Sequence, residues 1–152
     1  MSLRNRLQDL GLVLPESPKP LAAYVPALVV GDLVFVSGQL PFSDGQLLFT
    51  GAVPDLVSVE QAQMAARQCL LNGLAAAAGV LGSVDAIARI IQINGFVQSP
   101  QGFVQQPSVL NGASELALEL LQDAGKHTRT AVGVSSLPLN APVEISFVFS
   151  RR

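Results

Sequence analysis

The segment from Ile87 to Val97 constrains the fold more than any other part of this sequence. It is long, rich in β-branched residues and only weakly alternating between apolar and polar side chains. Such a segment is typical of a β-strand that is buried over much of both faces. It therefore indicates a sheet that is covered on more than one side, in part by other copies of the chain.

The scarcity of charge points in the same direction. The 152 residues include 9 Lys and Arg and 11 Asp and Glu, whereas apolar residues make up 49%. A monomer of this size exposes roughly 7,400 Å², so each charge would cover roughly 370 Å². This composition excludes a disordered chain, and the net charge of −2 argues against a strongly basic nucleic-acid binder. We expect one domain over residues 1–152, assembled as a homo-oligomer.

We expect neither membrane insertion nor metal binding. The most apolar stretch, from Gly73 to Gly82, is well under the ~20 residues that a membrane span needs. A single cysteine, Cys69, excludes an internal disulfide, and with the single histidine, His127, it cannot build a structural zinc site. A cytoplasmic, metal-free domain is the default expectation.

The periodicity predicts one α+β domain with the element order ββ-α-β-α-ββ. An amphipathic helix and an extended, proline-containing arm occupy residues 1–20. A capping box at Ser58 starts the first long helix, and Pro107 starts the second. The final two strands are expected to form a hairpin around residues 137–142. The predicted strands cover 27–30, 33–37, 87–97, 130–134 and 143–149, with a further short strand over 47–50.

Two charged residues stand on the apolar strands at the ends of that hairpin. Arg129 precedes the strand over 130–134, and Glu144 lies between Val143 and Ile145. One interpretation is an Arg–Glu pair across two strands, which contributes little if it is exposed. The other is a carboxylate-binding arginine with a neighbouring acid or base. Spacing alone leaves both interpretations open.

The other chemistry-bearing residues have simpler interpretations. Cys69 lies on the apolar stripe of the first long helix and is interpreted as a small core residue. His127 follows a helix end, where a structural role is as well supported as catalysis. Tyr24, the only tyrosine, either plugs the edge of the core or lines a pocket. No serine stands in a recognisable nucleophile motif.

Several motifs, taken in order, resemble the YjgF/RidA family of reactive intermediate deaminases. A bacterial branch of that family, which also carries the N-terminal helix, is more similar still, through Asn111, Ser114, His127 and residues 137–144. The family motifs lie within residues 20–149 and comprise Ala23-Tyr24, Val30 to Pro41 (VGDLVFVSGQLP), Ala66 to Asn72 (ARQCLLN), Arg129 to Val132 (RTAV), Leu137-Pro138 and Val143 to Ile145 (VEI).

The resemblance implies a chorismate-mutase-like fold. In that fold a mixed six-stranded sheet carries two helices on one face. It also implies a homotrimer, in which the three sheets surround a central barrel and the clefts lie between subunits.

The resemblance further implies hydrolysis of reactive enamines or imines, such as 2-aminoacrylate, to a 2-keto acid and ammonia without a cofactor. Arg129 matches the arginine that holds the substrate carboxylate, and Glu144 the glutamate that directs water and moves protons. Tyr24 matches a pocket tyrosine. Ser37 and Asn111 match positions near the cleft, and the backbone amide of Ala131 could add a donor to the carboxylate.

Two alternatives accompany this expectation. The first is a non-catalytic trimer that binds or senses small carboxylate metabolites in the same clefts. The second follows the endoribonuclease or translation-inhibitor label that some family members carry. The acidic pI near 5.2 and the lack of a basic run give RNA binding no support.

Overall fold

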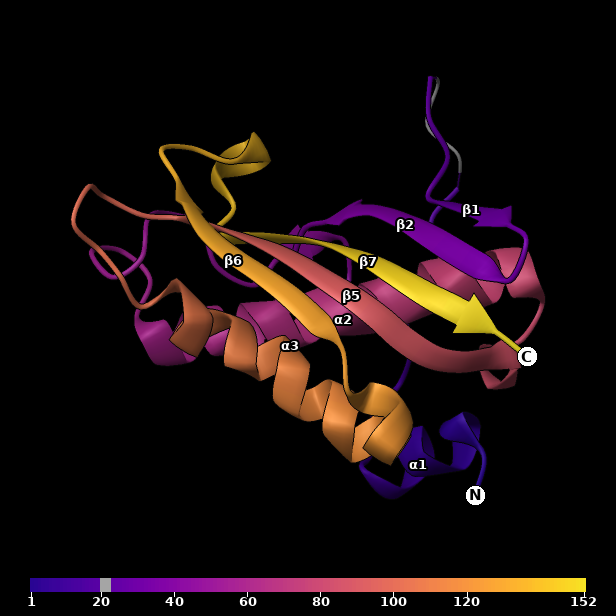
Figure 1. Cartoon of the computed structure of the whole chain (residues 1–152). Coiled ribbons are helices and arrows are strands. Elements are labelled where there is room, and N and C mark those ends of the chain that lie inside the picture. The colour runs from indigo at the N-terminus through magenta and orange to yellow at the C-terminus, as the bar shows by residue number, and fades with distance from the viewer. Residues whose placement is uncertain (20–22) are drawn as a thin grey trace.

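A mixed β-sheet forms the centre of the molecule (Figure 1). The computed structural model describes residues 1–19 and 23–152, so Pro20 at the end of the expected arm lies outside the described residues. The strand order is β1-β2-β7-β5-β6, and all neighbours are antiparallel except β5 and β6, which are parallel. The bounds are Ala27–Val30 (β1), Leu33–Gln39 (β2), Ile87–Gln98 (β5), Thr128–Val134 (β6) and Val143–Arg151 (β7). The expected α+β fold class is confirmed.

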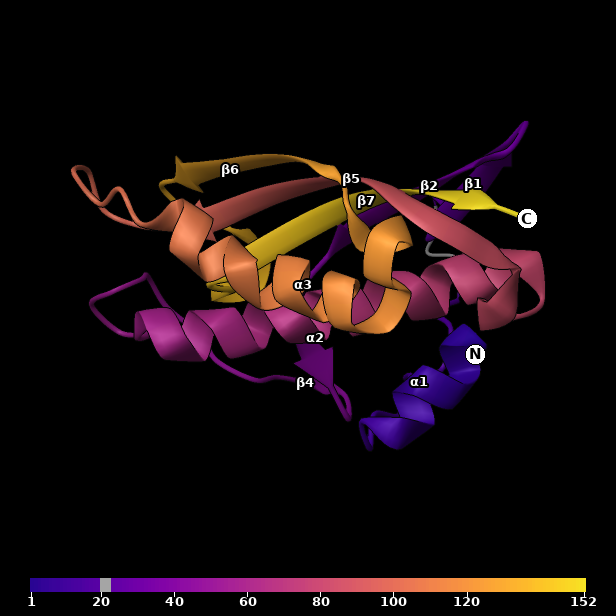
Figure 2. The ribbon, with the colours of Figure 1, turned by 60° about the horizontal axis from the view of Figure 1, so that its bottom comes forward.

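Two long helices cover one face of this sheet, α2 (Val59–Leu81) and α3 (Gln106–Leu121). The capping box predicted at Ser58 is present, with both Ser58–Gln61 bonds formed, and α2 ends at a left-handed Gly82 with φ of 80°. The short helix α1 (Leu3–Asp9) lies on the far side of α2 and α3 from the sheet (Figure 2). Three 3₁₀ turns complete the helical elements, at Val84–Ala86 (η1), Gln122–Gly125 (η2) and Pro138–Asn140 (η3).

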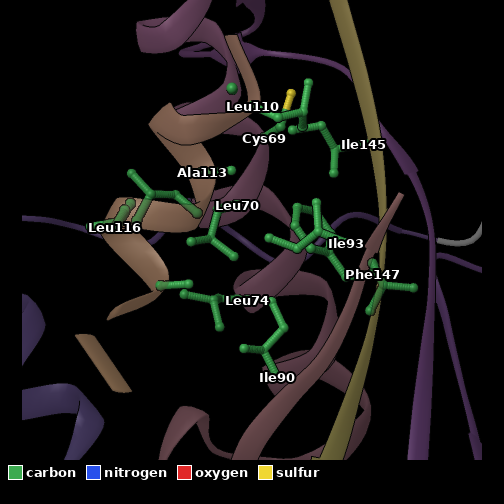
Figure 3. Packing of buried hydrophobic residues seen from close by; sticks show 14 of the residues in the cluster. Cys69, Leu70, Leu74, Ile90, Ile93, Leu110, Ala113, Leu116, Ile145 and Phe147 are labelled. Carbon is green, nitrogen blue, oxygen red and sulfur yellow. The ribbon is translucent and has the colours of Figure 1, made fainter. Parts of the chain in front are cut away.

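The core lies between the two helices and the sheet, as Figure 3 shows for the side chains around Leu70 and Phe147. Small residues permit close approach there. An added Cβ at Gly73 would overlap the Phe147 ring, and one at Gly112 would overlap the backbone of Gln63. By length and composition alone α2 could cross a membrane, but 12 of its residues are buried inside the fold. Its apolar character is therefore explained by packing.

The sheet has five strands, one fewer than expected. The short strand predicted over 47–50 forms instead a separate two-stranded ribbon, in which β4 (Gln46–Leu47) pairs with β3 (Phe42–Ser43). Asp44 and Gly45 connect the two with φ values of 52° and 80°. Two consecutive residues with positive φ form a tight hairpin turn, so this segment pairs locally.

The predicted hairpin between the last two strands is wrong. β5 lies between β6 and β7 and pairs with both of them. The apolar β5 segment takes a partner on each side, so residues 137–142 cross over it and do not form a tight turn. The two ends of the expected hairpin are therefore separated by a full strand.

The face of the sheet away from α2 and α3 carries no helix within the described part of the chain (Figure 2). We call it the open face. Its apolar side chains are solvent-exposed in the single chain, and on β1 and β2 they stand opposite one another in register. The exposed apolar residues of the open face are Leu28, Val30, Leu33, Phe35 and Val132.

Candidate functional site

A cavity of about 460 Å³ lies where β2 ends. The extended arm after α1 forms one wall through Pro15 and Lys19, and the ends of β2 and β7 form another. Three residues expected at the site, Tyr24, Ser37 and Glu144, line this cavity together. The fold therefore brings one half of the predicted site into a single pocket.

Glu144 reaches the cavity because of strand alternation and one glycine. Val143 and Ile145 are buried on the helix side of β7, which leaves Glu144 on the other side of the strand. The pairing of β2 with β7 is irregular between Val36 and Gln39, and an added Cβ at Gly38 would overlap Oε1 of Glu144. Gly38 thus makes the space that the carboxylate occupies.

Burial raises the pKa of Glu144 above its usual value. Within the described ranges, no Lys, Arg or His side chain lies within ion-pair distance of the carboxylate. A half-buried acid without an ion-pair partner holds a proton more readily than an exposed glutamate. It is therefore better suited than an exposed glutamate to exchange protons with a bound molecule.

The other cavity residues have their polar groups in defined positions. The Ser37 hydroxyl donates to the carbonyl of Val25 at 2.7 Å, so its oxygen lone pairs remain for a ligand. Tyr24 is 59% exposed at the cavity rim, so it lines a pocket and does not plug the core edge. Asn72 of α2 donates to the carbonyls of Leu40 and Phe42 at 2.9 and 3.0 Å and so fixes the chain that leaves β2.

The second half of the predicted site lies at β6, an edge strand. Nη1 of Arg129 donates to Oδ1 of Asn111 at 2.9 Å and to Oγ of Ser114 at 3.1 Å. Both acceptors belong to α3. Ala131 follows two residues later on the same side of β6 and packs against the core. In the described structure Nη2 and Nε of Arg129 make no hydrogen bond, so one edge of the guanidinium is available to an anion.

Arg129 and Glu144 do not meet within one chain. Arg129 is in register with Ile93 and Glu144 with Phe96 on the intervening β5. Two strand spacings separate them by about 10 Å across the sheet, and three residues by about 10 Å along it. Arg129 faces α3, whereas Glu144 faces away from the helix layer. The interpretation as an Arg–Glu pair across two strands is therefore wrong for the single chain.

The lone cysteine and histidine have structural surroundings. Cys69 is fully buried, and burial, together with the negative charge of Glu144, raises the pKa of its thiol well above its ordinary value. The interpretation as a core residue is confirmed. His127 contacts Gly125 and Ser114, the residue that also contacts Arg129. No group of three His, Cys, Asp or Glu side chains in residues 1–19 and 23–152 could hold a metal ion.

Two features of the site were not foreseen from the sequence. Gly38 directly follows the strand predicted over 33–37, and its role as the space for a carboxylate depends on the irregular pairing of β2 with β7. The contact of Ser114 with Arg129 depends on how α3 lies against β6. The spacing of Asn111 and Ser114, three residues apart on a helix, was the one available signal, because it places them on the same helix face.

Residues 4–151 match the protein family described as "YjgF/chorismate_mutase-like, putative endoribonuclease". Protein TCP17 of Trypanosoma cruzi is 39% identical over 140 residues, which cover 91% of this chain and 88% of that protein. Atu1372 of Agrobacterium tumefaciens, of unknown function, has 43% identity and a TM-score of 0.89 over 99% of this chain and 92% of its own. A Shewanella oneidensis MR-1 structure with the same endoribonuclease label has 31% identity and a TM-score of 0.93 over 99% of both chains.

Proposed function

Because the chain belongs to the YjgF/chorismate-mutase-like family, we propose that it hydrolyses enamines and imines derived from small amino acids, without a cofactor. The products are a 2-keto acid and ammonia. The observation that carries this proposal is Glu144, a half-buried acid that faces a cavity with Tyr24 and Ser37 and forms no ion pair with the described residues. An acid in this state can both accept and return a proton during hydrolysis.

The proposed active unit is a homotrimer. A single chain keeps Arg129 and Glu144 on different sides of β5 and of the sheet, so a second copy is needed to place a guanidinium beside the cavity. Arg129 belongs to the edge strand β6, where a neighbouring copy can approach. The exposed apolar residues of the open face, such as Phe35, support association of this kind.

In this proposal each residue has one task. Arg129 binds the substrate carboxylate through its unoccupied edge. Glu144 takes a proton from water as the water oxygen bonds to the imine carbon, and passes that proton to the imine nitrogen. It then moves the proton of the new hydroxyl to the same nitrogen, the C–N bond breaks, and ammonia leaves. Glu144 ends as it began, and the imine supplies the electrophile itself.

A coupled assay tests the proposal. A pyridoxal-phosphate dehydratase acting on serine releases 2-aminoacrylate, which tautomerises to the imine and hydrolyses slowly in water. We expect the protein to accelerate pyruvate formation with no metal or cofactor added and with chelator present. An unchanged rate at stoichiometric protein, across several amino-acid-derived imines, would contradict the proposed reaction.

Light scattering after size exclusion tests the proposed assembly. We expect a mass about three times the chain mass of 15.9 kDa at micromolar protein. A clean peak at the mass of one chain would remove the shared site, because one chain does not bring Arg129 and Glu144 together.

A second candidate, carboxylate binding without catalysis, is favoured by Arg129 alone. Its guanidinium is held in place by Asn111 and Ser114 whether or not a reaction follows. Calorimetric titration with 2-ketobutyrate and pyruvate separates the two functions when it is combined with the assay. Binding without acceleration would make the protein a metabolite binder.

A further inference from the structure

The geometry points to Ser114 and His127 as positioning residues for Arg129, an inference that rests on the carboxylate site proposed above. Neither residue would touch the substrate. They lie behind the guanidinium, on α3 and on the segment between η2 and β6. Their effect would be to fix the orientation in which Arg129 meets an anion.

The hydrogen bonds of His127 determine which atom donates and which accepts in the contacts that link His127, Ser114 and Arg129. Nδ1 lies 2.6 Å from the carbonyl oxygen of Gly125, which can only accept, so Nδ1 carries a proton. In the neutral ring Nε2 is then an acceptor. Ser114 Oγ lies 3.0 Å from Nε2, so the Ser114 hydroxyl donates to it.

This direction leaves Ser114 as an acceptor toward Arg129. Its only proton points to His127, so its lone pairs are available to Nη1 of Arg129 at 3.1 Å. A guanidinium can only donate, and Asn111 Oδ1 accepts the second Nη1 proton at 2.9 Å. The protons on His127 Nδ1, Ser114 Oγ and Arg129 Nη1 therefore each have one acceptor, and no hydroxyl proton faces the cation.

The result is a guanidinium that is held at one nitrogen and open along its other edge. An arginine free to rotate loses side-chain entropy when it binds a carboxylate, whereas a pre-oriented one has already lost it on folding. His127 acts through Ser114 and not on the ligand. Removing either residue should thus weaken carboxylate binding while Arg129 itself remains.

Four variants separate positioning from a general effect on the fold. Ser114→Ala and His127→Phe remove hydrogen bonds and keep the approximate size, whereas Ser114→Thr keeps the hydroxyl. Ser108→Ala is the matched control, because Ser108 is also a half-buried serine of α3 and its hydroxyl is not among the described hydrogen-bond partners of Arg129.

In calorimetry with 2-ketobutyrate we expect about three- to tenfold weaker binding for Ser114→Ala and His127→Phe. Ser114→Thr and Ser108→Ala should stay within about twofold of the wild type. Equal affinity in the wild type and in both Ser114→Ala and His127→Phe would overturn the positioning role while leaving the proposed function intact.

A measurement without ligand tests the positioning of Arg129 separately from the proposed function. Nitrogen-15 spectra of the Arg129 guanidinium should show distinct, slowly exchanging Nη signals in the wild type, and these should merge in Ser114→Ala and not in Ser108→Ala. If these signals change as expected but the wild type binds no carboxylate, the orienting network stands and the proposed function fails. Unchanged signals in Ser114→Ala would overturn the network itself.

Discussion

The two halves of the candidate site are built in opposite ways. Around Glu144 the fold leaves space, because Gly38 has no side chain and no described cation forms an ion pair with the carboxylate. Around Arg129 the chain adds partners, because Asn111 and Ser114 hold one nitrogen of the guanidinium. The first arrangement tunes a proton affinity through burial, and the second fixes a direction. We therefore expect changes at Glu144 to alter reaction rate and changes at Arg129 to alter affinity.

The largest effect is expected for Glu144→Gln, which keeps the shape but cannot accept a proton. Acceleration of 2-aminoacrylate hydrolysis should fall about 100- to 10,000-fold, the range for loss of a general acid–base group. Binding of 2-ketobutyrate and the oligomer mass should change little. Glu115→Gln, at an exposed position on α3, is the matched control. If Glu144→Gln kept the wild-type rate, Glu144 would have no chemical role, and the contrast between a rate effect at Glu144 and an affinity effect at Arg129 would be wrong.

Gly38→Ala is expected to have the next largest effect. The new Cβ overlaps the end of the Glu144 side chain, which can rotate away, so the fold should lose only about 1–3 kcal/mol of unfolding free energy. The displaced carboxylate should nevertheless lower the rate about 100-fold. Because both changes act through the same group, the double variant Gly38→Ala/Glu144→Gln should be no slower than Glu144→Gln. Additive losses would show that Gly38 acts elsewhere.

Arg129→Lys tests the expectation that changes at Arg129 alter affinity for a carboxylate. A lysine keeps the charge but cannot offer the planar fork, so we expect a loss of about 1.5–3 kcal/mol, or about 10- to 150-fold in affinity for 2-ketobutyrate. Arg67→Lys, at an exposed pair with Glu119, is the control. Calorimetry that finds equal affinities for wild type and Arg129→Lys would remove Arg129 from the site.

The smallest effect concerns stability as a function of pH. Because burial raises the pKa of Glu144 in the fold, the folded state favours its protonated form. Its favourable contribution is present below the usual pKa of glutamate and is lost as pH rises through the raised pKa. Glu144→Gln should therefore be more stable than the wild type in urea unfolding at neutral pH, with the difference vanishing at about pH 4. A difference that grows on acidification would contradict the raised pKa.

The local elements could be predicted from the sequence, because their signals are local. The capping box at Ser58, the proline near the start of α3 and the apolar β5 segment all gave elements at the expected places. Strand order was the part that failed. The last two predicted strands, 130–134 and 143–149, are neighbours along the chain. They are not neighbours in the sheet, because β5 lies between them and is hydrogen-bonded to one on each edge.

The candidate site was predictable as residue identities and not as an arrangement. The resemblance to the family named Tyr24, Ser37 and Glu144, which share a cavity, and Arg129 with Asn111, which are hydrogen-bonded. No periodicity in the sequence shows that the cavity residue Glu144 and Arg129 lie two strands apart in the sheet. Nor does any motif show that a serine and a histidine stand behind the arginine, because those contacts depend on the packing of α3 on β6.

The close approach of α2 and α3 has a mechanical consequence. Gly112 rests against the backbone of Gln63, so no side chain is available at that point to rearrange and absorb a displacement. α3 carries the partners of Arg129, and α2 carries Asn72, which holds the chain at the mouth of the cavity. The two helices therefore have little room to shift independently at that point, and the partners of Arg129 and the residue that holds the cavity mouth stand on one closely packed helix pair.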